Sequence, residues 1–231
     1  MKRFLKFVAL GVLLGLSLAF VQHILGIDEE IFQKYTYIAL VSAFVLVVVY
    51  NLAYTLPLSI AITKNMRLVG EGKADEAIRN LGELRDRAKK KKCRRLATIC
   101  TVNLAAAYLD EHNFDMVIEE LESIDSSRLN PELRLVYALN LMSAYLNTDK
   151  NKLACELYEE NKGIIEKYKN DSRYRDTIAL NTALILLSNK DIEGARKITE
   201  IARTKVKNEK YIKAFDIVET EIERIENGDD K

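Results

Sequence analysis

The chain contains little of what marks a disulfide-bonded, metal-binding or strand-rich protein. Its 231 residues include 2 prolines, 2 histidines, 3 cysteines and no tryptophan. The cysteines, Cys93, Cys100 and Cys155, form no C-x-x-C pair, so we expect reduced thiols in a reducing compartment. Leucine, alanine, glutamate, lysine and isoleucine dominate instead, and this composition favours an all-α fold.

A net charge and the usual catalytic motifs are also missing. The 35 basic and 34 acidic side chains leave a net charge of +1, so any electrostatic function must be local. The sequence has no H-E-x-x-H, no phosphate-binding G-x-x-x-x-G-K-[ST] and no dinucleotide fingerprint. We therefore expect no enzymatic activity, no cofactor, no metal and no small-molecule substrate.

Two long stretches have no charged residue at all. They cover residues 7–27 and 35–63, and a bilayer is crossed by about 20 apolar residues in a helix. Only residues 28–34 separate them, which is a length suited to a turn. The sequence predicts a transmembrane helical hairpin in residues 1–62, with spans at about 7–27 and 36–62.

The basic residues that flank the two predicted spans indicate their orientation. Lys2, Arg3 and Lys6 precede the first span, while Lys64 and Arg67 follow the second. Because basic residues stay on the cytoplasmic side, we expect both termini and the remaining chain in the cytoplasm of a bacterial cell, at its membrane.

A cleaved signal peptide is the alternative interpretation of the N-terminus. Residues 1–3 are Met-Lys-Arg and precede an apolar run, as in a signal peptide. However, the apolar run is long, and residues 19–21 lack the small-x-small cleavage pattern. The first stretch also holds Gly11 and Gly15 in a G-x-x-x-G pattern, which allows membrane helices to approach closely.

After residue 63 the chain becomes amphipathic and repeats itself. Four short polar turns each precede a small or β-branched residue, at intervals of 37 to 41 positions: Ala77, Val117, Ala154 and Ala195. Nine residues before each of these stands Leu68, Tyr108, Tyr145 or Leu186. Asn130-Pro131 and Asp191 supply helix N-caps between these points.

This pattern resembles the tetratricopeptide repeat (TPR) over residues 63–203. Leu104-Ala105 before Tyr108, and Leu141-Met142 before Tyr145, carry the resemblance most clearly. It implies a TPR-like α-solenoid in residues 63–226, with about four helix pairs and a C-terminal capping helix at about 209–225. We expect the tail, residues 227–231, to be disordered.

Three asparagines are the main candidates for partner binding. Asn103, Asn140 and Asn181 each lie five residues before Tyr108, Tyr145 or Leu186, so they occupy equivalent places in successive repeats. The TPR resemblance implies that this place lines a concave groove, where an amide both donates to and accepts from a peptide. The alternative is that each asparagine satisfies the backbone of a neighbouring helix. The groove neighbours at the same offsets are Ala106, Leu109, Ser143, Leu146, Leu184 and Leu187.

Residues 85–95 form a strongly basic run. It contains Lys89, Lys90, Lys91, Lys92, Arg94 and Arg95. It is either a solvated turn or a contact with anionic lipid at the membrane surface. Nucleic acid is not an expected partner, because no aromatic residue interleaves the run.

Together these features favour a membrane-anchored, TPR-like adaptor that binds an apolar segment of a partner protein in its groove. An accessory or assembly subunit, bound to a membrane complex through the hairpin, is the first alternative. An enzyme with an unrecognised site is the second.

Overall fold

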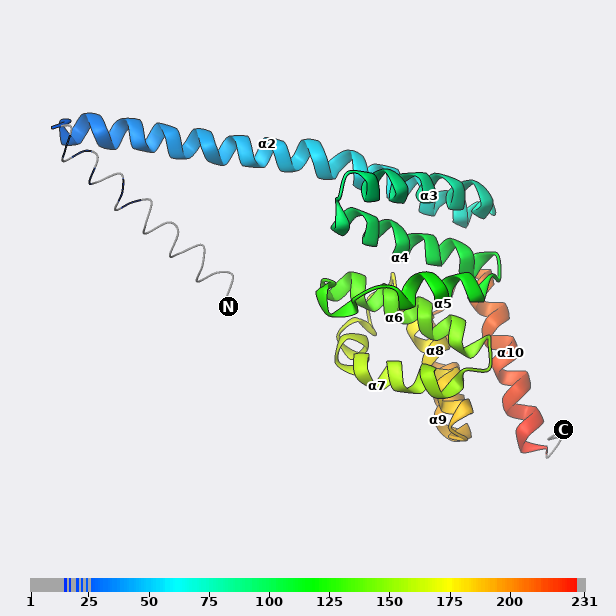
Figure 1. Cartoon of the computed structure of the whole chain (residues 1–231). Coiled ribbons are helices and arrows are strands. Elements are labelled where there is room, and N and C mark those ends of the chain that lie inside the picture. The colour runs from blue at the N-terminus through cyan, green and yellow to red at the C-terminus, as the bar shows by residue number, and fades with distance from the viewer. Residues whose placement is uncertain are drawn as a thin grey trace. The chain divides into compact units, whose positions relative to one another are not determined.

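The computed structural model describes residues 26–227 and, before them, Gly15, Ser17, Phe20, Gln22 and Ile24; the side chains at 50, 51, 54, 55 and 58 are not described. These residues form helices and the connections between them, with no strand among them (Figure 1). The chain divides into two compact units, Met1–Ile60 and Ala61–Lys231. The all-α prediction is confirmed.

The longest helix, α2, covers Glu29–Gly70 and continues through Pro57. Asp28 caps it, because its Oδ1 accepts hydrogen bonds from the backbone N–H of Glu30 at 3.0 Å and of Ile31 at 3.3 Å. Residues 29–34, predicted as a turn between two spans, are therefore helical. The acidic Glu29 and Glu30 favour this start, since they lie at the positive end of the helix dipole.

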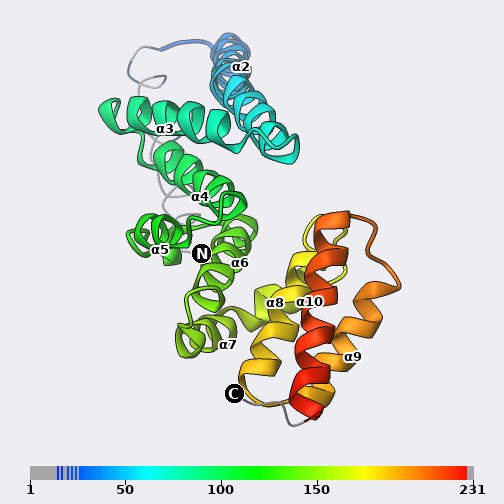
Figure 2. The ribbon, with the colours of Figure 1, turned by 90° about the vertical axis from the view of Figure 1, so that its right-hand side faces the viewer.

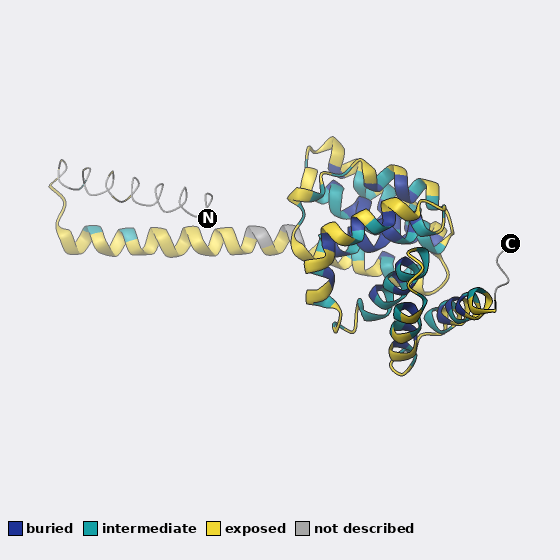
Figure 3. Ribbon diagram, turned by 90° about the horizontal axis from the view of Figure 1, so that it is seen from below, coloured by how far each residue is buried: buried dark blue, intermediate teal, exposed yellow. Residues whose placement is uncertain are grey.

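Within the described residues, one helix segment is long and apolar enough to cross a membrane, Glu29–Val49. Its large apolar residues are exposed, among them Phe44 and Leu46. Figure 3 accordingly draws most of this helix in the colour of exposed residues. Most of the first predicted span, residues 7–27, lies outside the described residues, and so does the predicted disordered tail beyond Asn227. The structure thus shows one exposed apolar helix near the N-terminus.

The second unit consists of sequential antiparallel helix pairs. The end of α2 precedes α3 (Ala74–Lys90); the following pairs are α4 (Arg94–Asp110) with α5 (Phe114–Glu122), α6 (Pro131–Leu146) with α7 (Asn151–Tyr168), and α8 (Arg175–Ser188) with α9 (Ile192–Arg203). A short 3-10 helix, Ser126–Arg128, precedes α6, and α10 (Glu209–Glu226) completes the unit. The first helices of successive pairs also pack on one another, α4 on α6 and α6 on α8 (Figure 2).

The turns inside the pairs share one backbone conformation. In each, one residue has a positive φ, between 56° and 72°: Gly72, His112, Asp149 and Lys190. The next backbone N–H donates to the carbonyl five residues earlier, at 2.9 Å, and the acceptors are Leu68, Tyr108, Tyr145 and Leu186. These four acceptors are the repeat positions found in the sequence. A helix that ends in this way depends only on residues within about five positions of one another. This explains why the repeat in the sequence was enough to locate the turns.

The helix caps agree with the sequence. The Asn130 Oδ1 accepts from the Leu133 backbone N–H at 2.9 Å, and Pro131 begins α6. The Asp191 Oδ1 accepts from the Gly194 N–H, also at 2.9 Å. The final helix begins at the predicted residue, Glu209. Buried apolar residues then form one cluster across α4 to α8 and a smaller one that joins α8, α9 and α10.

Candidate functional site

Asn140 and Asn181 lie inside the stack of repeats. Their side chains are 8% and 2% exposed. The Asn140 Nδ2 donates to the Val102 carbonyl of α4 at 3.2 Å, and the Asn181 Nδ2 donates to the Leu139 carbonyl of α6 at 3.0 Å. Each asparagine on the first helix of a repeat thus bonds to the first helix of the preceding repeat.

Ser143 completes the contact between α6 and α8. Its Oγ donates to the Asn181 Oδ1 at 2.9 Å, so the Asn181 amide both donates and accepts within the core. The sequence allowed these asparagines either to bind a peptide or to satisfy the backbone of a neighbouring helix. In the structure, Asn140 and Asn181 bond to a neighbouring helix. Neither amide faces a surface where a partner could reach it.

Asn103 behaves differently from the other two. It is half-buried, and its Nδ2 donates to the Ile99 carbonyl of its own helix at 2.8 Å. Asn65, near the end of α2, likewise donates to its own helix and accepts from the Asn80 Nδ2 of α3 at 3.0 Å. Asn103, Asn140 and Asn181 occupy equivalent places in the sequence but have two different roles. Asn103 bonds within its own helix, whereas the other two bond to the preceding repeat.

The other expected groove residues are all half-buried, and three of them meet in one cavity. Ala106, Leu109, Ser143, Leu146, Leu184 and Leu187 keep part of their surface exposed. Leu146, Leu184 and Leu187 line a cavity of about 280 Å³. Its remaining lining residues are Asn147, Asn151, Ser188, Glu221 and Ile225, so it lies between α6, α7, α8 and α10. We call it the α6–α10 cavity.

Sequence reasoning missed the part of this cavity that α10 contributes. Val218 and Ile222 of α10 are buried in the cluster that also contains Leu184 and Leu187. The chain's own last helix thus covers part of the apolar surface assigned to a partner. An amphipathic pattern identified the helix, but no local signal says on which neighbours it packs.

Polar contacts hold α10 at this place. Lys210, in its first turn, forms a salt bridge with Asp110 at the end of α4, with 2.5 Å between Nζ and Oδ1. The hydroxyl groups of Tyr211 and Thr177 are hydrogen-bonded at 2.5 Å, which joins α10 to α8. These contacts bring together residues as far apart in the sequence as 110 and 210.

The chemistry of the α6–α10 cavity suits an apolar side chain. Its leucines supply an apolar wall, and its amides, the Ser188 hydroxyl and Glu221 supply a polar edge. The Glu221 carboxylate is 2.6 Å from the Arg224 guanidinium, so its charge is partly balanced. No cluster of three or more histidine, cysteine, aspartate or glutamate side chains suited to a metal occurs in the described part of the chain.

The Cys100 thiol shows no sign of activation. Burial raises the pKa of the Cys100 thiol to about 11, and the nearby positive Arg85 offsets this only in part. A thiol with this pKa stays protonated at neutral pH, whereas nucleophiles and metal ligands are thiolates. Cys100 therefore acts as a small buried residue of α4.

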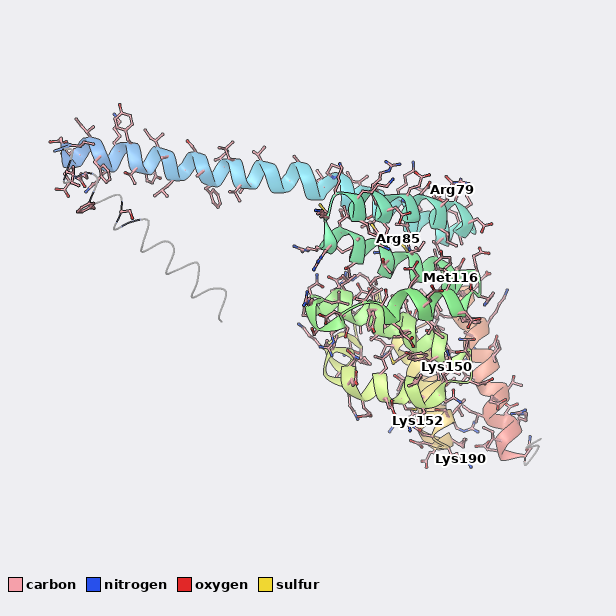
Figure 4. All side chains as sticks on the ribbon, viewed as in Figure 1. Arg79, Arg85, Met116, Lys150, Lys152 and Lys190 are labelled. Carbon is pink, nitrogen blue, oxygen red and sulfur yellow. The ribbon has the colours of Figure 1, made fainter. Side chains whose placement is uncertain are left out.

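The basic run occupies the end of α3, the α3–α4 turn and the start of α4. Lys89, Lys90, Lys91, Lys92, Arg94 and Arg95 are all exposed. Arg85, labelled on α3 in Figure 4, is different: its guanidinium is hydrogen-bonded to the Glu120 carboxylate of α5 and to Asp86. Arg85 thus belongs to the packing between helices, and the other six are free of it.

The geometry defines an all-helical protein of consecutively packed helix pairs, with an exposed apolar helix in its N-terminal unit. No protein-family model matches the chain, and no curated protein and no solved structure matches it either.

Proposed function

We propose that this protein is a membrane-anchored, TPR-like adaptor. Its N-terminal unit would anchor it in the cell membrane as a two-span hairpin, with both termini in the cytoplasm. Its helical-repeat unit would bind an apolar segment of a partner protein at the α6–α10 cavity. This is a binding role and not a catalytic one.

The apolar surface of α2 supports the membrane part of the proposal. Between Glu29 and Val49 its large apolar side chains point outward on all sides and none of this segment is buried. Water disfavours such a surface at about 25 cal/mol per Å², and lipid tails do not. Lys64 and Arg67 follow it, as expected for a cytoplasmic end.

The α6–α10 cavity is the observation that carries the partner-binding part. It gathers Leu146, Leu184 and Leu187 from two successive repeats and leaves each partly exposed. A cavity of this size accepts one or two apolar side chains, and its amides and hydroxyl can bond to the backbone beside them. The burial of Asn140 and Asn181 moves the proposed contact from those residues to these leucines.

Site-specific photocrosslinking in native membranes tests this proposal. A photoreactive residue at Leu146 should capture one defined partner. The matched control is Leu153 of α7, an exposed leucine that does not line the cavity. Equal capture at both positions would show that the cavity is not the binding site.

Replacing the N-terminal unit distinguishes the adaptor from an accessory subunit of a membrane complex. The exposed apolar surface of α2 could also bind the helices of such a complex. With an unrelated two-span anchor in place of residues 1–60, an adaptor keeps its crosslink from position 146. An accessory subunit loses it, because its partner recognises the membrane helices.

A further inference from the structure

The exposed cations of the α3–α4 connection have no acidic partners. We call Lys89, Lys90, Lys91, Lys92, Arg94 and Arg95 the basic turn. No acidic residue occurs in the sequence between Asp86 and Asp110. Among the described residues, no carboxylate lies within salt-bridge distance of these six side chains. Six positive charges are therefore gathered in seven consecutive positions without neutralisation.

Many other exposed cations of the second unit are neutralised by a neighbour. Examples are Arg87 with Glu83 at 2.8 Å, Lys169 with Glu166 at 2.6 Å and Arg173 with Glu132 at 2.5 Å. Because the whole chain carries +1, the residues outside the basic turn carry a net −5. The basic turn is thus a cluster of positive charge on a chain whose other residues are net acidic, and its electric field favours binding of a polyanion.

The register of α3 against the end of α2 places the basic turn at one end of the second unit. The hydrogen bond of 3.0 Å between the Asn80 Nδ2 and the Asn65 Oδ1 sets this register. Lys90 follows Asn80 by about 15 Å along α3, and Ala61 precedes Asn65 by about 6 Å along α2. Since the two helices are antiparallel, the basic turn lies at the end of the unit where its first residue, Ala61, lies.

The backbone of the turn is closed and holds these side chains outward. Lys92 has a φ of 56°, its N–H donates to the Lys89 carbonyl at 3.0 Å, and the Cys93 N–H donates to the Ala88 carbonyl at 2.9 Å. This is the same closed geometry as in the turns within the helix pairs. Lysines and arginines on a fixed turn lose less freedom on binding than they would on a flexible loop.

We propose that the basic turn binds anionic lipid headgroups of the membrane that holds the N-terminal unit. This inference rests on the proposed membrane anchoring. The chain enters the second unit at the end that carries the basic turn, so this is the end from which the chain continues to the proposed anchor. Clusters of this size and position are attracted to acidic phospholipids, while the absence of aromatic residues disfavours nucleic acid. The contact would hold the repeat unit in one orientation above the membrane.

Limited trypsin cleavage of the full chain in nanodiscs tests the contact. One set of nanodiscs contains phosphatidylcholine alone, and in the other a third of the lipid is phosphatidylglycerol. Cleavage after Arg94 and Arg95 is measured relative to cleavage after Lys150 and Lys152 in the same chain. We expect it to be about tenfold slower with phosphatidylglycerol, because bound headgroups shield the turn. High salt should abolish the difference, since it screens exposed charges.

Two variants assign the effect to the basic turn. The variant K89Q/K90Q/K91Q/K92Q keeps Arg94 and Arg95 as cleavage sites but should lose most of the phosphatidylglycerol-dependent protection. The control, K150Q/K152Q/K190Q, removes three exposed lysines from two other turns and the start of α7 (Figure 4) and should keep the protection. Its cleavage is normalised to cleavage after Arg203. Loss of protection in both variants to the same extent would show a general charge effect and overturn the proposal.

The remaining outcomes separate this inference from the proposed function. Equal cleavage in both lipids, in a chain that inserts into nanodiscs, overturns the lipid contact and leaves the anchor intact. A chain that inserts into neither nanodisc overturns the anchor and the lipid contact together. Stronger protection by added polyglutamate or RNA than by phosphatidylglycerol would identify a different polyanion and overturn the lipid assignment.

Discussion

The two units place the same apolar side chains in opposite environments. Phe44 and Leu46 of α2 are both 69% exposed, whereas Phe215 and Leu81 of the repeat unit are 0% exposed. The difference follows from how apolar residues are distributed around each helix. A helix with one apolar face buries that face on a neighbour, but a helix that is apolar on all sides needs an apolar solvent or several partners. The distribution of apolar residues around α2 therefore determines which environment this helix requires.

Exposure alone does not separate the two units. Ile217 of α10 is also 69% exposed, and Ile201 of α9 is 48% exposed. These are single apolar residues on otherwise charged helices, and such residues are common on soluble surfaces. In α2 every residue from 37 to 49 is exposed, and the sequence has no charged residue from 35 to 63. Continuity, and not the exposure of any one residue, distinguishes a surface suited to a membrane.

Charges introduced on the apolar helix should have the largest effect. In the variant F44R/V48R, two arginines replace exposed residues one helical turn apart in α2. Each arginine costs about 3 kcal/mol near the centre of a span, so we expect membrane integration to fall by more than tenfold. The fraction that resists carbonate extraction measures this in a chain that begins at residue 28, so that α2 is its one long apolar segment.

The matched control for that variant is I201R/I217R, which changes two exposed isoleucines of the repeat unit. Its integration should equal that of the unchanged protein. If both variants integrate normally, the exposed surface of α2 is not in contact with lipid, and the comparison between the units would no longer hold.

A substitution within α10 should have the next largest effect, because this helix contains both environments. Phe215 is fully buried, and Ile217, two residues later, is exposed. We expect Phe215→Ala to destabilise the repeat unit by about 3–5 kcal/mol, through lost burial and the cavity left behind. Ile217→Ala should change its stability by less than about 0.5 kcal/mol. Urea unfolding of the full chain in a mild detergent, followed by circular dichroism, measures both.

That result also tests whether α10 is an integral part of the repeat unit. A helix that merely rests on α8 and α9 would detach without unfolding the remainder. Phe215→Ala would then leave the main urea transition unchanged and add a small transition of its own. A single transition at a lower urea concentration is the expected outcome.

The smallest expected effect is the loss of stability when an asparagine of the repeat unit is replaced, and its size should differ between the two roles that these asparagines have. Asn181→Ala removes two hydrogen bonds between repeats, one of them fully buried, and we expect it to cost about 1–3 kcal/mol. Asn103→Ala removes a bond within its own helix and replaces asparagine with a better helix former, so its effect should stay within about 0.5 kcal/mol. The same urea unfolding measures both, and equal effects would contradict the assignment of Asn181 to repeat stacking.

The order of helices and turns in the repeat unit was predictable because local interactions encode it. The residues Leu68, Tyr108, Tyr145 and Leu186 were found from spacing alone, and each one's carbonyl closes a turn of its own repeat. Asn130, Asp191 and the start of α10 follow the same rule, since a cap bonds to residues within three positions. The helical start of α2 was missed because Asp28 and the two glutamates after it were taken for a connecting turn.

The candidate site was predictable only in part, because it depends on contacts between distant segments. Leu146, Leu184 and Leu187 were found by their equivalent positions, and the structure brings them to one cavity. Glu221 and Ile225 could not be found in this way, since they come from a helix outside the repeat pattern. The position of α10 depends on burial of Val218 and Ile222 and on the pairing of Lys210 with Asp110.

The sequence by itself determined the helical class, the spacing of the repeats, the closed turns and the apolar character of α2. Each of these depends on residues within a few positions of one another or on the composition of a single stretch. Only the tertiary structure decided that the amides of Asn140 and Asn181 join repeats while that of Asn103 stays within its helix. The same amide can bond to a partner, to its own helix or to a neighbour, and the choice depends on which carbonyl the packing of the helices brings within reach.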